Sequence, residues 1–152
     1  MARRSTRASS RILQADYPGR VSFSRGYDDE LAHLIEAACD MFVMPSLYEP
    51  CGLNQMYILR YGTVPIVRKT GGLADSVVPY DPATGQGTGI VFEQFSSEAL
   101  EWAMNIALDL HAQPSHWARM VRNGMTQDFS WQRQGALYLD LYEKLLKTPE
   151  TA

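Results

Sequence analysis

Apolar and polar residues along the chain form short blocks that alternate between two periods. Asp28 suits a helix N-cap, and four residues after it recur at the spacing of one buried helix face: Leu31, Leu34, Ile35 and Ala38. The run Met41–Met44 is apolar throughout and stops at Pro45. Continuous runs of this kind are typical of strands that are buried on both faces of a parallel sheet.

The same alternation continues to the end of the chain. Further strands are predicted at 21–23, 64–67 and 89–92, and Pro65 should lie near the start of its strand because proline lacks an N–H. Helices are predicted over about 53–60, ending at Gly62, and from near Ser97, near Pro114 and after Ser130. Strand–loop–helix repeats predict an α/β fold, a Rossmann-like three-layer α/β/α arrangement with a mostly parallel sheet.

Two glycine-bearing loops follow predicted strands, so both should open onto the carboxyl edge of the sheet, where such folds bind ligands. In the first loop, Glu49 to Asn54 precede a helix, whose N-terminal N–H groups suit a phosphate. Gly52 permits close approach of the backbone to a ligand, and the Glu49 carboxylate can accept two sugar hydroxyls. From these residues alone, an ordinary capped helix after a strand is the favoured interpretation.

The second loop contains Thr70, Gly71 and Gly72. Its paired glycines indicate either backbone held near a ligand or only a tight turn. Tyr27 follows the first predicted strand at the same edge, where it would either stack on a base or pack as an ordinary loop aromatic.

Composition narrows the functional classes. The chain has 152 residues, which suits one domain, and its net charge of −3 gives no indication of nucleic acid or an anionic membrane as a partner. No apolar run reaches the length of a membrane span. Two cysteines make no disulfide framework, so a reducing, cytoplasmic location is expected. The three histidines lack a ligand spacing with acids or cysteines, so no metal site is predicted.

The loops belong to a longer string that resembles a known family. The string comprises Pro45–Gln55, Tyr61–Pro65 and Lys69–Val77, with additional matches at Gly26–Asp28 and Asp128–Trp131. It closely resembles the signature of bacterial glycogen synthases and plant starch synthases over about residues 16–147. The resemblance implies the C-terminal, donor-binding half of a GT-B glycosyltransferase.

Members of that family transfer glucose from ADP-glucose to an α-1,4-glucan with retention of configuration. The resemblance assigns Glu49 to the glucose hydroxyls and the transition state, and places Tyr27 against the adenine. The other donor-binding residues that it implies are Cys51, Gly52, Leu53, Asn54, Thr70, Gly71 and Gly72. Many members carry threonine at position 54. The resemblance implies no metal and no cofactor besides the donor substrate, and it leaves ADP-glucose against UDP-glucose open.

Domain boundaries follow from the same match. Residues 1–15 form an Arg/Ser-rich leader that is either disordered or a remnant helix, and whose composition also suits a transit peptide. Residues 16–147 form the partial glycosyltransferase domain, and 148–152 form a tail. The family's N-terminal domain and two donor-neutralising cations have no counterpart here, so the isolated chain is expected to be inactive or nearly so.

Three interpretations therefore stay open: a synthase fragment, a non-enzymatic module that binds a nucleotide sugar or a glucan, and one half of a split synthase. Apolar faces left uncovered by the absent parts predict self-association.

Overall fold

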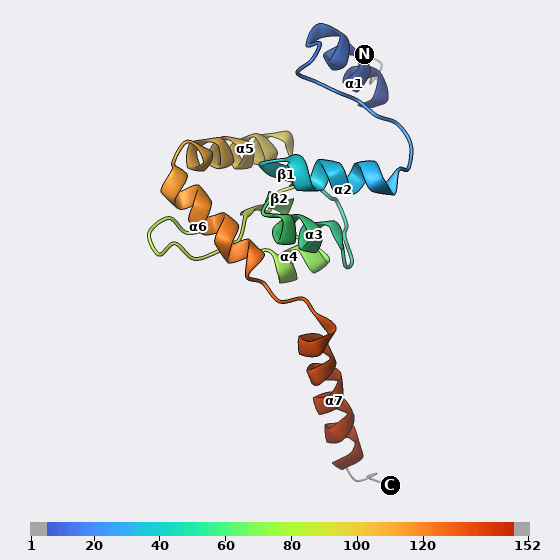
Figure 1. Ribbon diagram of the computed structural model, residues 1–152, viewed down its shortest axis with the longest axis vertical. Coiled ribbons are helices and arrows are strands. Elements are labelled where there is room, and N and C mark those ends of the chain that lie inside the picture. Colours follow the sequence, from blue (N-terminus) through green and yellow to red (C-terminus); the bar gives the residue numbers. More distant parts are fainter. Residues whose placement is uncertain (1–5, 148–152) are drawn as a thin grey trace. The chain divides into compact units, whose positions relative to one another are not determined.

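The computed structural model describes residues 6–147 (Figure 1). The chain divides into two compact units, with the boundary between Ala32 and His33. The first unit contains α1 (Thr6–Asp16), so the predicted leader is helical over all of the part that is described. The tail 148–152 lies outside the described residues.

Residues 21–23 do not form the predicted strand. The Val21 N–H donates to the Tyr17 carbonyl at 3.0 Å, and the Phe23 N–H donates to Gln14 Oε1 at 3.0 Å. No strand within residues 6–147 pairs with this segment. The prediction was wrong because a short run with β-prone residues such as Val21 and Phe23 forms a strand only when a neighbouring strand pairs with its backbone.

The second unit contains a parallel three-stranded sheet in the order β1 (Met41–Met44), β2 (Val64–Arg68) and β3 (Ile90–Phe92). Met41 pairs with Val64, and Ile66 pairs with Ile90. Pro65 is the second residue of the central strand, as predicted, and the pairing with β3 begins one residue after it. The missing proline N–H therefore interrupts no regular part of the β2–β3 ladder.

Five helices within residues 6–147 occupy predicted places, whereas α4 (Gly71–Ser76) forms where the sequence predicted only a glycine loop. Asp28 Oδ1 accepts from the Leu31 N–H at 3.0 Å and caps α2 (Asp29–Ala38), while Gly62, at φ 89°, ends α3 (Asn54–Tyr61) in the left-handed region. The cap of α5 (Ser97–His111) is Ser96 rather than Ser97, because the Ser96 hydroxyl accepts from the Ala99 N–H. The remaining helices are α6 (Pro114–Met125) and α7 (Trp131–Lys147).

Helices cover both faces of the sheet (Figure 1). Val64 and Ile66 pack with Ala103 and Ala107 of α5 and Met120 of α6. Alternate residues of a strand point to opposite faces, so Val67 packs instead against Leu73 of α4 and Val77 beyond it. These contacts confirm the three-layer α/β/α arrangement.

Each helix in the described part of the chain is too short or too polar to traverse a bilayer. α7 differs from the other helices of the second unit in having no buried residue. Its predicted apolar stripe is at least half exposed: Tyr138, Leu141, Tyr142 and Leu145.

Candidate functional site

The first candidate loop leaves the carboxyl end of β1 and enters α3. Glu49 lies in this loop and is half-buried. The Ser46 hydroxyl donates to Glu49 Oε2 at 3.4 Å, a long hydrogen bond that leaves Oε1 free to accept from a ligand. A carboxylate with spare acceptor capacity at this edge can bind hydroxyl groups.

The second candidate loop contacts the first through its backbone. The Gly72 N–H donates to the Glu49 carbonyl at 3.0 Å. A Cβ at Gly72 would lie 2.5 Å from the Cys51 carbonyl carbon, and one at Gly71 would lie 2.9 Å from the Glu49 carbonyl carbon. Both glycines are thus required for two backbones to approach closely, and they form the first turn of α4 rather than a free turn.

The buried side chain of Gln55 supports the first loop through hydrogen bonds, a role that the sequence did not reveal. Its side chain is fully buried, and Nε2 donates to the carbonyls of Cys51 and Gly52, each at 3.1 Å. Gly52 has φ 69°, and a Cβ there would collide with the Gln55 amide. A polar residue at a buried position of an otherwise apolar helix face was the only signal in the sequence.

The N-terminus of α3 has no side-chain cap. Leu53 occupies the N-cap position and offers no acceptor, so the first backbone N–H groups of the helix stay available. These groups and the partial positive charge of the helix end suit an anion. The Asn54 side chain does not point its amide at this end, because Nδ2 donates to Glu36 Oε1 at 2.8 Å.

Two basic residues at the end of β2 were also missed. Arg68 donates to the carbonyls of Ser46 and Leu47 and thereby ties the first loop to β2. Lys69 pairs with Glu93 at 2.9 Å, and this hydrogen bond, with the charge attraction, raises the pKa of Lys69 and lowers that of Glu93. A basic pair directly after a strand, next to Thr70, was the available signal.

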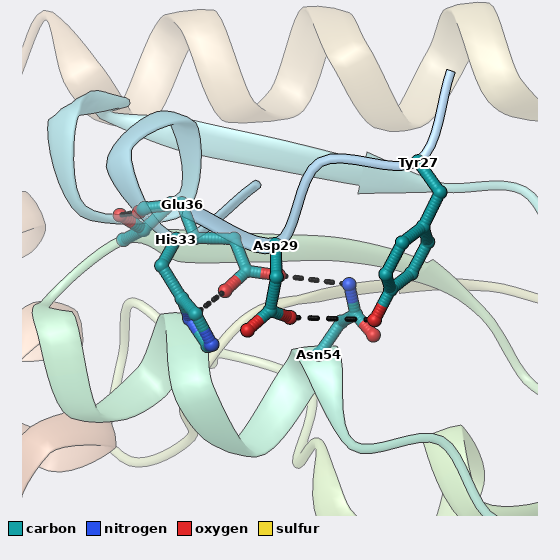
Figure 2. A network of polar contacts seen from close by, with 6 residues as sticks. Tyr27, Asp29, His33, Glu36 and Asn54 are labelled. Atoms are coloured by element: carbon teal, nitrogen blue, oxygen red, sulfur yellow. Dashed lines mark hydrogen bonds and ion pairs between the residues drawn. The ribbon is translucent and has the colours of Figure 1, made fainter. Parts of the chain in front are cut away.

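Tyr27 belongs to the first unit. Its ring is 93% exposed, and its hydroxyl donates to Asp29 Oδ1 at 3.4 Å (Figure 2). The ring faces are free, but the stacking role stays a prediction. Cys51 is exposed and Cys39 is half-buried, both as free thiols. Within residues 6–147, no group of three or more His, Cys, Asp or Glu side chains gathers closely enough to hold a metal ion.

Comparison with known proteins identifies the family. The model described as "Glycosyl transferases group 1" matches residues 3–124. The chain belongs to this family. Glycogen synthase from Thioalkalivibrio sulfidiphilus (strain HL-EbGR7) is 52% identical over 141 residues, which cover 91% of this chain and 29% of that protein. Glycogen synthase from Koribacter versatilis (strain Ellin345) is 51% identical, over 88% of this chain and 28% of that protein.

Solved structures agree. The catalytic domain of starch synthase IV from Arabidopsis thaliana, bound to ADP and acarbose, matches with a TM-score of 0.78 and 35% identity, over 90% of this chain and 29% of that one. Sucrose-phosphate synthase from Thermosynechococcus elongatus matches with a TM-score of 0.65 and 26% identity, over 92% of this chain and 34% of that one. The resemblance to glycogen and starch synthases is confirmed, and the chain spans less than a third of the length of these glycogen synthases.

Proposed function

We propose that this chain binds the nucleotide-sugar donor of a retaining glycogen or starch synthase. Its ligand is ADP-glucose, and the reaction of the whole enzyme is transfer of glucose to an α-1,4-glucan. The observation that carries the proposal is the joined pair of loops at the carboxyl edge of the sheet, where the Gly72 N–H bonds the Glu49 carbonyl beside the uncapped end of α3.

The two ligand groups have separate places at this edge. The backbone of Cys51, Gly52 and Leu53 at the start of α3 receives the distal phosphate and the sugar. Glu49, whose carboxylate has one oxygen without a donor among residues 6–147, accepts the glucose hydroxyls and stabilises positive charge at the reacting carbon. Thr70, Gly71 and Gly72 border the same pocket. The ADP bound to Arabidopsis starch synthase IV supports an adenine nucleotide.

Calorimetric titration of the 152-residue chain with ADP and with UDP tests the donor. Saturable binding of ADP that is tighter than binding of UDP is expected. Tyr27→Ala should weaken ADP binding about tenfold, since stacking on one base contributes roughly 1–3 kcal/mol. Glu49→Gln should leave ADP affinity within about twofold, because its carboxylate contacts the sugar. Absence of heat at millimolar ADP would overturn the proposal.

A glucose-transfer assay with ADP-glucose and glycogen tests whether the chain is one half of a split enzyme. Turnover only after addition of a relative's N-terminal domain supports one half of a split enzyme. ADP binding without turnover under either condition supports a binding module or an inactive fragment. Turnover by the chain alone contradicts the expected need for further cations and an opposite domain.

Self-association is part of the same proposal. The exposed stripe of α7 should bury itself in a dimer or larger assembly, as apolar patches of this kind do. Light scattering that shows a monomer at 100-fold different concentrations would contradict it. A cytoplasmic location is supported by the two free cysteines.

A further inference from the structure

Glu36 is the only buried residue of α2 within the part of the helix that is described, and it is charged. It is 2% exposed, whereas three apolar residues of the same helix are far more exposed: Leu31, Leu34 and Ile35. Burial of a carboxyl group is costly unless hydrogen bonds compensate it. The contacts that Glu36 makes must therefore compensate the cost of its burial.

Each oxygen of the Glu36 carboxyl group has a side-chain partner within hydrogen-bond distance (Figure 2). Oε1 accepts from Asn54 Nδ2 at 2.8 Å, and Oε2 lies 3.1 Å from His33 Nδ1. The His33 ring in turn meets the Tyr57 ring edge-on, with centroids 5.2 Å apart. Both oxygens are thus satisfied by side chains that lie on, or pack against, α3.

The backbone of Glu36 is fixed as well. Its carbonyl accepts from the Thr63 hydroxyl, which also donates to the Cys39 carbonyl at 2.8 Å. Thr63 directly precedes β2 and is itself buried. These contacts restrict the position of the Glu36 carboxyl group. Its hydrogen bond therefore fixes the position of the Asn54 side chain.

We propose that Glu36 is a positioning residue of the donor site, acting through Asn54 on the N-terminus of α3. Asn54 is the first residue of α3 and comes directly after the Cys51–Leu53 segment. Holding its side chain fixes the direction in which the first N–H groups of the helix point. The inference rests on the proposed donor site, and it makes Asn54 a positioning residue rather than a phosphate ligand.

A double-mutant cycle tests this order of action. Glu36→Met and Asn54→Ala should each weaken ADP binding about tenfold, the effect of losing one hydrogen bond to a charged group. In the Glu36→Met background, Asn54→Ala should add less than about twofold, because both changes remove the same link. A further tenfold loss in the double variant would instead make Asn54 a direct ligand and overturn the proposal.

Two variants control for stability. Glu36→Gln keeps an acceptor oxygen for Asn54 and should bind ADP within about twofold of the parent chain. Thr88→Val removes a buried hydroxyl that accepts from the Val78 N–H, outside both loops and α3, so it should lower thermal stability without changing ADP affinity. If Thr88→Val lost as much ADP affinity as Glu36→Met, general destabilisation would account for the loss in both variants. That result would overturn the positioning role.

A ligand-free measurement separates this inference from the proposed function. Backbone amide resonances of residues 52–55 should move in the same direction in Glu36→Met and in Asn54→Ala, and remain in place in Thr88→Val. Unchanged amides in the first two variants would overturn the positioning role whether or not ADP binds. Absence of ADP binding by the parent chain, with the amides moved, would overturn only the donor site.

Discussion

Substitution of Gly72 by alanine tests the contact between the two loops. The new Cβ would lie 2.5 Å from the Cys51 carbonyl carbon and 2.8 Å from its Cα. The Cβ would lie closer still to the Cys51 carbonyl oxygen, and carbon atoms rest at about 3.5 Å or more, so the loops must separate by more than about 1 Å. That shift breaks the Gly72–Glu49 hydrogen bond, worth about 1 kcal/mol, and overpacking adds about 1–3 kcal/mol.

The expected sum is a loss of about 2–4 kcal/mol, or a fall in Tm of roughly 5–15 °C for a chain of this size. Circular dichroism gives the melting midpoint, and calorimetry gives the accompanying loss of ADP affinity. Gly135→Ala is the matched control, because a Cβ there meets nothing within 4 Å and alanine favours the helix. A Gly72→Ala chain that melts with the parent and binds ADP equally would refute the close-approach reasoning.

Three further changes probe the structure elsewhere. Gln55→Leu removes both hydrogen bonds to the loop carbonyls, so it should weaken ADP binding and lower the free energy of unfolding, measured in urea, by about 1–3 kcal/mol. An unchanged urea midpoint would show that Gln55 does not support the loop. Thr63→Val leaves the buried carbonyl of Glu36 without its donor and should cost about 1–3 kcal/mol in the same assay, whereas Thr70→Val, outside this network, should cost less. Asp81 accepts from the Ala83 N–H, which lowers its pKa from the ordinary 3.8, so its stabilising contribution is present above that pH and is lost as pH falls through the folded-state pKa. The free energies of unfolding of the parent chain and of Asp81→Asn should therefore converge as the pH is lowered. A difference between them that does not change with pH would contradict this linkage.

Local patterns predicted most elements of the second unit because they depend on residues close in sequence. The stripe after Asp28, the stop at Gly62 and the apolar run from Met41 each specify a helix or strand by period, cap or burial alone. Residues 21–23 failed for the complementary reason, since a strand is defined by a partner that its own residues do not encode. For the candidate site, the sequence located both loops, but it did not show that the Asn54 side chain is held by Glu36, which lies 18 residues earlier.

By itself, the sequence determined the alternation of strands and helices, the parallel α/β class and the family. These follow from periodicity and from a motif that is recognised in short stretches of sequence, chiefly between positions 45 and 77. Only the tertiary structure showed why positions 71 and 72 require glycine. A sequence shows that a glycine is tolerated, but the reason lies in which backbone passes within reach of its missing Cβ, and here that is the segment from Glu49 to Cys51.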